Sequence, residues 1–145
     1  MQVRIKKLDP HAIVPTYASA DSAGADLYAC CFAPVEIPAG HTALIHTGLA
    51  VEIPEGYCGL VYARSGLATK KGLAPANKVG VIDADYRGEV MVSLYNHGDL
   101  TQTVMPGERI AQLVVAPFLR AEFELSEELS DTVRGEGGFG STGSR

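Results

Sequence analysis

The sequence contains 145 residues, which is enough for one domain with a sizeable buried core. Hydrophobic residues make up 46% and charged residues 20%, a balance typical of a soluble globular protein. The net charge is −5, whereas proteins that bind nucleic-acid polymers usually carry a basic excess that neutralises phosphates. We therefore expect no nucleic-acid polymer as a partner. A small phosphorylated ligand would need only a few local cations.

The cysteine pattern argues against both a disulfide framework and a structural zinc site. The three cysteines, Cys30, Cys31 and Cys58, are odd in number, and none has the spacing of zinc ligands. Free thiols fit a reducing compartment. The longest apolar run, residues 113–119, is too short to span a bilayer, and the N-terminus lacks a signal-peptide core. We therefore expect a cytoplasmic protein with no membrane partner.

Glycines and prolines divide the chain into short apolar segments. In one of them, Val90, Val92 and Leu94 occupy one face and the intervening residues the other, which is the period of a strand. Short strands separated by frequent turns predict an all-β fold, a jelly-roll-like sandwich or barrel. The predicted strands cover residues 43–53, 57–63, 89–95 and 109–117.

Residues 64–72 interrupt this β pattern and predict one short helix. Ser65 is placed to serve as its N-cap. Lys70 and Lys71 fall in the last turn, and Gly72 suits the position that follows it.

The start of this helix is a candidate anion site, because free backbone N–H groups and the helix dipole attract negative charge. Arg64 adds a cation there, Ser65 adds a hydroxyl, and Gly66 completes the segment. A phosphate group is the natural occupant. The alternative is that Ser65 only caps the helix and that Arg64 is solvated.

A second candidate site follows an apolar strand. Val81 and Ile82 lead directly into Asp83, which is followed by a turn that contains Asp85 and Tyr86. A carboxylate at the end of an apolar strand is a candidate general base. The alternative is that both aspartates make Asx-type bonds within the turn.

The C-terminal part of the chain is poor in apolar residues. Residues 122–131 contain five acidic residues and no basic one, which predicts a solvated surface strand or turn. The glycine-rich segment 134–143 cannot form a packed element alone, so it is either a disordered tail or an arm that orders on a ligand. We expect a β domain over residues 1–133 and an arm over residues 134–145.

Five segments of the chain resemble, in order, the five motifs of the trimeric dUTPase (deoxyuridine 5′-triphosphate nucleotidohydrolase) family. The resemblance extends from about residue 8 to residue 143 and departs from the family pattern at Ala25 and Ala63, both at packing positions. The segments are residues 23–27, 64–72, 80–89, 106–112 and 134–143.

The resemblance implies hydrolysis of dUTP to dUMP and pyrophosphate by attack of water on the α-phosphorus. This reaction supplies dUMP for thymidylate synthesis and keeps uracil out of DNA. Carried onto this chain, Asp83 would orient and deprotonate the water, and Gln112 would hold that water or the α-phosphate. The β- and γ-phosphates would be held by Arg64, Ser65 and Gly66.

The family also implies a Mg²⁺ ion. The triphosphate itself would chelate most of this ion, and Asp26 would reach it through water. Such an arrangement suits an ion that keeps its waters and prefers phosphate oxygens.

The resemblance assigns further residues to substrate selection. Asn77 and the backbone of the hairpin over residues 81–91 would read the uracil edge, with Val81, Ile82 and Met91 lining it. Tyr86 would lie against the deoxyribose and collide with a 2′-hydroxyl group, which rejects UTP. In the arm, Phe139 would stack on the base and Arg134 would bind the γ-phosphate, with Gly140, Ser141 and Thr142 beside them.

The family implies a homotrimer whose active sites take parts from all three chains. The nearest alternative is an enzyme of the dCTP deaminase type, although nothing in the sequence suggests zinc. A second alternative is a non-catalytic nucleotide-binding homologue, which would not need Asp83 as a water-activating carboxylate. A third is a jelly-roll interaction module, which leaves the coincidence of five motifs unexplained.

Overall fold

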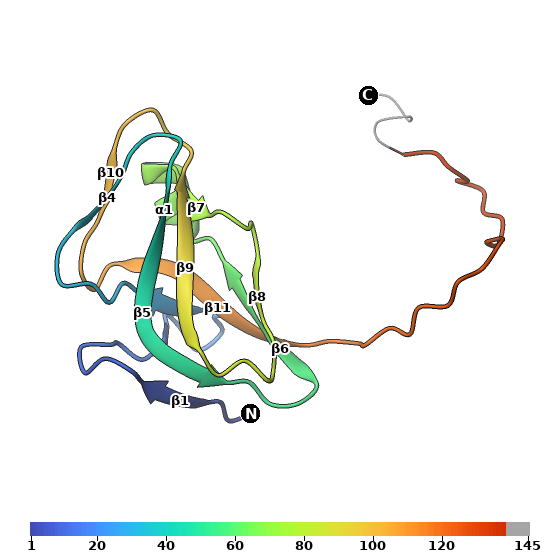
Figure 1. The fold of residues 1–145 in the computed structure, drawn as a ribbon, viewed down its shortest axis with the longest axis horizontal. Helices are drawn as coiled ribbons and strands as arrows, with labels where there is room; N and C mark the ends of the chain where they lie inside the picture. The colour runs from blue at the N-terminus through green and yellow to red at the C-terminus, as the bar shows by residue number, and fades with distance from the viewer. Residues whose placement is uncertain (139–145) are drawn as a thin grey trace.

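The computed structural model describes residues 1–138, and in this part of the chain short β-strands dominate (Figure 1). The elements are β1 (Arg4–Lys7), β2 (Thr16–Tyr17), β3 (Ala25–Tyr28), β4 (Val35–Ile37), β5 (Thr42–Glu52), β6 (Tyr57–Tyr62), α1 (Ser65–Lys71), β7 (Leu73–Pro75), β8 (Gly80–Ile82), β9 (Glu89–Asn96), β10 (Gln102–Val104) and β11 (Arg109–Pro117). The prediction of an all-β, jelly-roll-like fold with one short helix is confirmed.

The strands pair antiparallel in three sheets. One sheet has the order β1-β5-β9-β7, a second has the order β2-β3-β11-β6-β8, and the third consists of β10 and β4. Apart from the β2–β3 pair, all neighbouring strands are non-consecutive in the sequence, which is typical of jelly-roll connections. The core lies between the sheets and contains Leu27, Ile45, Leu94 and Ile110, none of which is more than 1% exposed.

The period-2 alternation that predicted strands matches the observed burial. Val90, Val92 and Leu94 of β9 are buried, whereas Met91 between them is exposed. The predicted strand over residues 109–117 has the bounds of β11. The predictions for β6 and β9 differ from the observed strands by one residue at one end, and the prediction for β5 differs by one residue at each end. Burial of alternate apolar side chains therefore sets the orientation of each strand.

Helix α1 differs from the prediction at its first residue. Ser65 is helical, and the N-cap is Arg64, whose backbone is extended (φ −93°, ψ 128°) and whose side chain makes no capping bond. The C-terminal prediction is confirmed, because Gly72 has the left-handed φ of 65° and donates its N–H to the Ala68 carbonyl. Its lack of a side chain also matters, because a Cβ there would lie 3.0 Å from the Gly98 nitrogen.

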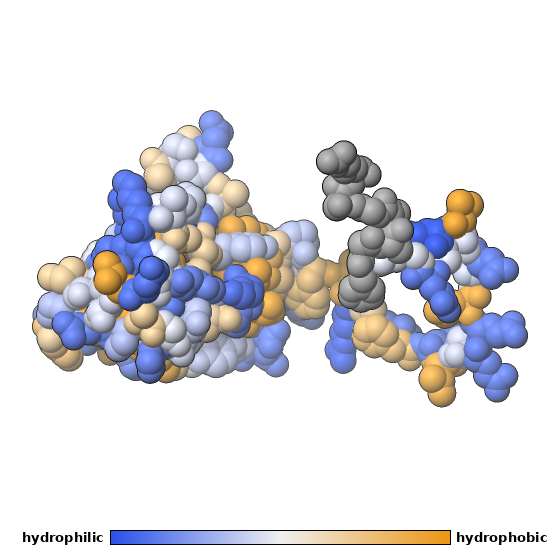
Figure 2. All heavy atoms as spheres, turned by 90° about the horizontal axis from the view of Figure 1, so that it is seen from above, coloured by the Kyte–Doolittle hydropathy of each residue, from blue (hydrophilic) through white to orange (hydrophobic). Residues whose placement is uncertain are grey.

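Beyond β11 the chain leaves the sheets and runs away from them as an open segment (Figures 1 and 2). Residues 122–131 are exposed, as expected for the acidic stretch, but they form neither a strand nor a turn. Several large apolar side chains in this segment are at least 90% exposed, and Figure 2 shows such residues spread along it: Leu119, Phe123, Leu125, Leu129 and Val133.

Cys30, Cys31 and Cys58 are free thiols. Within residues 1–138, no helix combines the length and apolar character that crossing a bilayer requires.

Candidate active site

The structure places the predicted site residues that precede the arm in two cavities. The first, of about 350 Å³, is lined by Asp26, Arg64, Ser65, Gly66 and Gln112 together with six neighbours, and we call it the Arg64 cavity. The second, of about 270 Å³, contains Asn77, Val81, Ile82, Asp83, Tyr86 and Met91, and we call it the Tyr86 cavity.

The register of the five-stranded sheet explains how the Arg64 cavity forms. Gln112 of β11 lies opposite Asp26 on β3 and, on its other side, opposite Tyr62 at the end of β6. Arg64 follows two residues after Tyr62, at the start of α1. Three adjacent strands therefore bring together side chains that are far apart in the sequence.

Asp26 is buried, with 7% of the residue exposed, and two arginines bind its carboxylate. Its Oδ1 accepts a hydrogen bond of 2.6 Å from Arg64 Nε, and its Oδ2 accepts one of 3.3 Å from Arg109 Nη1. Because Arg64 uses Nε in this ion pair, its two terminal nitrogens are not needed for it. Asp26 therefore fixes the guanidinium group while leaving its outer edge for another anion.

Arg109 was not among the predicted site residues. It lies 83 residues from Asp26 in the sequence, and the pairing of β11 with β3 brings them together across an irregularity in register next to Arg109. Its only sequence signal is its place in the 106–112 segment that resembles a family motif.

The side-chain amide of Gln112 is held from two sides. Its Nε2 donates to the Ala63 carbonyl at 2.8 Å. A Cβ at Gly24 would approach the Gln112 Cβ to 3.1 Å, so glycine there makes room for the side chain. Gln112 is thus positioned beside Asp26 before any ligand binds.

The start of α1 is open. Ser65 and Gly66 are exposed, and the first helical turn contains no acidic residue. A Cβ at Gly66 would meet no atom of the described chain within 4 Å. Packing inside one chain therefore does not explain the glycine, whereas close approach of a ligand to the backbone would.

The Tyr86 cavity forms between β8, β9 and the turn that joins them. Asp83 directly follows β8, is exposed, and accepts the Tyr86 N–H at its carbonyl at 3.1 Å. Within residues 1–138, the carboxylates of Asp83 and Asp85 make no hydrogen bond, so the Asx-turn alternative gains no support. The Asp83 carboxylate is free to accept a hydrogen bond from water.

Two glycines shape this cavity. A Cβ at Gly88 would come within 3.0 Å of the Tyr86 ring, and a Cβ at Gly80 would lie 3.2 Å from Asn77 Nδ2. Tyr86 also donates its hydroxyl to the Glu89 carbonyl at 2.9 Å. Glu89 lines the cavity but was not among the predicted site residues.

Neighbouring residues of β6 line the two cavities, Val61 one and Tyr62 the other, but Arg64 and Asp83 lie apart within one chain. In the β6–β8 register Ile82 faces Gly59, and Arg64 comes five residues after Gly59. At a rise of about 3.3 Å per residue, this places Arg64 about 17 Å along the sheet from the strand end that carries Asp83. One chain therefore assembles each group of predicted residues but does not bring the two groups together.

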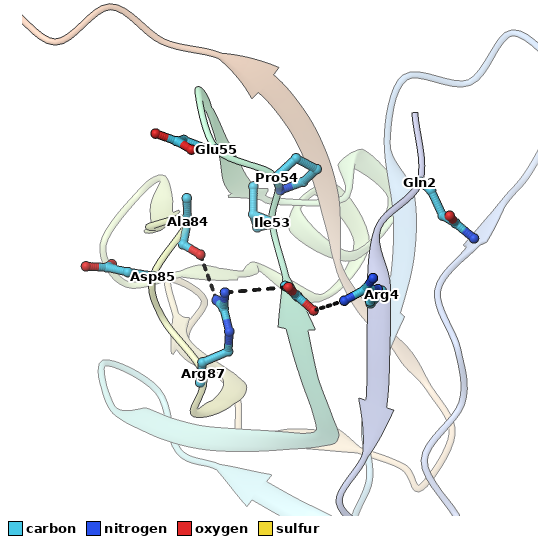
Figure 3. A pocket seen from close by; sticks show the side chains of 9 residues that line it. Gln2, Arg4, Ile53, Pro54, Glu55, Ala84, Asp85 and Arg87 are labelled. Carbon is cyan, nitrogen blue, oxygen red and sulfur yellow. Dashed lines mark hydrogen bonds and ion pairs between the residues drawn. The ribbon is translucent and has the colours of Figure 1, made fainter.

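A larger cavity of about 520 Å³, shown in Figure 3, contains none of the predicted site residues. Ala84, Asp85 and Arg87, from the turn that follows Asp83, line one side of it. There Arg87 donates to the Ala84 carbonyl at 2.7 Å and lies 3.9 Å from Glu52, which also pairs with Arg4 at 3.5 Å. Arg87 thus stabilises the turn by a hydrogen bond within it and links the turn to the end of β5 through Glu52.

A metal ion finds few protein ligands in the described residues. Residues 1–138 contain no grouping of three or more His, Cys, Asp or Glu side chains suited to hold a metal. Both Asp26 oxygens accept hydrogen bonds from arginines, so direct coordination by several protein groups does not fit. The donor set does fit an ion that arrives with a phosphate ligand and contacts Asp26 through water.

The predicted arm residues stand apart from both cavities or lie beyond the described chain. Arg134 is in the projecting segment, where its Nε donates to the Gly137 carbonyl at 2.7 Å. Phe139, Gly140, Ser141 and Thr142 lie outside the described residues.

Comparison with known proteins places this geometry in a family. The dUTPase family model matches residues 10–143. A deoxyuridine 5′-triphosphate nucleotidohydrolase of Acinetobacter baumannii is 49% identical over 148 aligned positions, which cover 99% of each chain.

Solved structures agree with this match. A variant of the Staphylococcus bacteriophage 80alpha dUTPase with dUpNHpp has a TM-score of 0.84 and 31% identity, covering 98% of both chains. A variant of the dUTPase from phage phi11 of S. aureus, described with a structural Mg(II) ion, has a TM-score of 0.78 and 28% identity, covering 88% of this chain and 98% of that one. The chain belongs to the dUTPase family.

Proposed function

We propose that this protein hydrolyses dUTP to dUMP and pyrophosphate by attack of water on the α-phosphorus. The observation that carries the proposal is the exposed Asp83 carboxylate at the rim of the Tyr86 cavity, which pairs with no group of residues 1–138, in a chain of the dUTPase family. A carboxylate with free oxygens can orient a water molecule and accept its proton. In the cell, the product would supply thymidylate synthesis and the reaction would keep uracil out of DNA; the proposed location is the cytoplasm.

The Arg64 cavity is proposed to bind the phosphates. Arg64, oriented by Asp26 through Nε, has terminal nitrogens for a β- or γ-phosphate oxygen. The Ser65 hydroxyl and the backbone near Gly66 add donors at the open helix start. Gln112, held by Ala63, would contact the α-phosphate or the attacking water.

Mg²⁺ bound with the triphosphate would reduce the repulsion that an incoming water meets and would stabilise the departing pyrophosphate. The residue proposed to reach it, through water, is Asp26. Each oxygen of the Asp26 carboxylate already accepts one hydrogen bond from an arginine, so the contact with the water would use the remaining lone pairs.

The Tyr86 cavity is proposed to bind the nucleoside. Asn77 and the backbone around Val81, Ile82 and Met91 line a space suited to a flat base. A snug wall excludes the extra methyl group of thymine, and main-chain donors do not match the amino group of cytosine. Tyr86 is proposed to face the deoxyribose and to exclude a 2′-hydroxyl group.

We also propose that the protein is a homotrimer whose active sites are shared between chains. The separation of about 17 Å between Arg64 and the Asp83 strand end, estimated from the strand rise, supports a site built from more than one chain. The projecting segment supports the same view, because Phe123 and Leu125 are fully or almost fully exposed there.

The last part of the proposal concerns the C-terminus. Residues 1–133 would form the β domain with its projecting segment, and residues 134–145 would form an arm that closes over the bound substrate. Arg134, Phe139, Gly140, Ser141 and Thr142 are the arm residues proposed to contact phosphate and base. Closure of a glycine-rich arm would exclude bulk water from the reaction.

A substrate panel tests the proposed function. Pyrophosphate release is measured with dUTP, dTTP, dCTP and UTP, each with Mg²⁺, and ammonia release is measured in parallel. We expect pyrophosphate from dUTP far above the other three nucleotides. Ammonia from dCTP would instead indicate a deaminase. Tight binding of dUTP without turnover would indicate a non-catalytic nucleotide-binding protein.

A further inference from the structure

Strand β5 contains a bulge next to the Tyr86 cavity. His46 lies opposite Met91 of β9, and the next pair in register is Ala50 with Glu89. Three residues of β5 therefore face a single residue of β9, which leaves part of the β5 backbone outside the regular ladder. Gly48 lies in the middle of this bulge with a left-handed φ of 67°.

The side chain of Glu89 binds into this bulge. Its Oε1 accepts the Gly48 N–H at 2.8 Å, and its Oε2 lies 2.9 Å from His46 Nδ1. The neighbouring Thr47 hydroxyl donates to the Val90 carbonyl at 2.6 Å. The Glu89 carboxylate thus accepts a hydrogen bond from the Gly48 N–H, a backbone donor that lies outside the regular strand pairing because of the bulge.

The surroundings favour the charged form of this carboxylate. Burial raises the pKa of Glu89, but the hydrogen bonds from His46 and from the Gly48 amide outweigh this effect, and the pKa lies below its usual range. Gly48 is also closely surrounded, because a Cβ there would come within 2.9 Å of Ala12 and 3.0 Å of Cys30 Sγ. Glu89 is therefore anchored to a closely packed part of the backbone.

The main chain of Glu89 in turn holds Tyr86. The Tyr86 hydroxyl donates to the Glu89 carbonyl at 2.9 Å, and the ring lies against Gly88. Tyr86 is 42% exposed, and within residues 1–138 the Glu89 carbonyl is the hydrogen-bond partner of its hydroxyl. The orientation of Tyr86 therefore depends on where the Glu89 carbonyl lies.

We propose that Glu89, held in the β5 bulge by His46 and Gly48, is a positioning residue for Tyr86 and sets the rejection of ribonucleotides. The inference rests on the proposed function, in which Tyr86 faces the deoxyribose. A side chain rejects a 2′-hydroxyl group by collision only if it cannot swing aside. Glu89 supplies that rigidity without touching the sugar itself.

The test compares kcat/KM for dUTP with kcat/KM for UTP. Glu89→Ala is expected to lower the dUTP-to-UTP ratio about tenfold or more, because Tyr86 gains freedom to yield to the 2′-hydroxyl group. Tyr86→Phe removes the hydroxyl that binds the Glu89 carbonyl and is expected to lower the ratio similarly. The double variant should lose little more than either single one, because both remove the same restraint.

Glu89→Gln separates positioning from general structural support. Its amide oxygen can still accept from the Gly48 N–H, and its amide nitrogen can donate to an unprotonated His46 ring, so selectivity should recover toward that of the wild type. Glu36→Ala, an exposed acid on β4, serves as the matched control and should leave the ratio unchanged.

Several outcomes would overturn the inference. One is a folded Glu89→Ala protein with wild-type selectivity; another is a variant that loses activity on both nucleotides equally and is not rescued by Glu89→Gln. If Glu89→Ala does not fold, His46→Ala removes one of the two anchors and must lower the ratio for the inference to stand. A wild type that does not prefer dUTP would instead refute the proposed role of Tyr86, which separates failure of the proposed function from failure of this inference.

Discussion

Two aspartates of this chain have opposite surroundings, and their proposed roles follow from that difference. Asp26 is buried and gives one oxygen to each of two arginines. Asp83 is exposed at the end of β8, and no described group binds its carboxylate. The first is arranged to orient a cation and the second to accept a proton from water. The environment, rather than the residue type, assigns the proposed roles.

The role of Asp83 leads to a prediction for Asp83→Asn. The amide keeps the size of the side chain but cannot accept a proton, so we expect turnover of dUTP to fall by a factor of about 10² to 10⁴. Binding of a nonhydrolysable dUTP analogue should stay close to that of the wild type. Pyrophosphate release and calorimetric titration measure the two effects.

Asp85→Asn is the matched control for this experiment, because Asp85 is an exposed acid in the same turn but does not line the Tyr86 cavity. It should retain most of the turnover. High residual turnover in Asp83→Asn, together with lost binding, would contradict the general-base role.

At the scale of elements, helix α1 shows why a short helix occurs in this β fold. It has seven residues, too few to be stable alone, and it buries Leu67 against the core. Lys71 ties its last turn to β10 and to Glu108, through bonds to the Thr103 carbonyl and the Glu108 carboxylate. These contacts anchor the C-terminal end and leave the N-terminal end open toward the Arg64 cavity.

This asymmetry gives a prediction for Gly66→Ala. A helical glycine replaced by alanine stabilises by roughly 0.5–1 kcal/mol, and the new methyl group meets no described atom of the same chain. The free energy of unfolding should therefore rise slightly. The affinity for dUTP should fall, because the new methyl group keeps the phosphates away from the backbone at residue 66. Urea unfolding and titration with the nonhydrolysable analogue measure the two quantities.

Ala68→Gly, in the same helix, is the converse control and should lower stability without a comparable loss of affinity. If Gly66→Ala leaves affinity unchanged, the helix start does not approach the ligand closely.

The same elements show what local sequence can and cannot predict. The alternation of Val90, Val92 and Leu94 predicted β9, because side-chain burial with period 2 is a local property. The prediction that Ser65 is the N-cap was wrong. The backbone stays extended through Arg64, so the helix begins at Ser65 and Arg64 is the N-cap. Capping residues and strand ends therefore carry the main local errors.

Contacts between distant strands were beyond local patterns. The bond from Arg109 to Asp26 spans 83 positions and that from the Gly48 N–H to Glu89 spans 41. Both depend on strand order and on irregularities in register, which no spacing along the chain encodes. The resemblance to family motifs pointed to the segments that contain Asp26, Arg64, Arg109 and Glu89, but not to the contacts between these residues or to Gly48.

At the scale of the whole molecule, β11 is followed by a segment whose residues 119–138 make hydrogen bonds only with one another within the described part of the chain. The segment carries several exposed apolar side chains, including Phe123, Leu125 and Leu129. An isolated chain gains no stability from such residues, whereas a second copy could bury them. The proposed trimer would therefore use the projecting segment for assembly and the arm beyond it for catalysis.

Two truncations separate these roles. Removal of residues 134–145 should leave the melting temperature and the oligomer size nearly unchanged, because the last hydrogen bonds of this segment are local ones such as Gly135 N–H to the Thr132 carbonyl. Pyrophosphate release should fall about 100-fold or more, because misplacement or exposure of the reacting groups costs that much.

Removal of residues 118–145 should in addition reduce the oligomer to monomers, measured by light scattering. A protein lacking only residues 144–145 is the control and should keep full activity. An unimpaired rate after removal of residues 134–145 would contradict the proposed arm, and an intact trimer after the longer truncation would contradict assembly through the projecting segment.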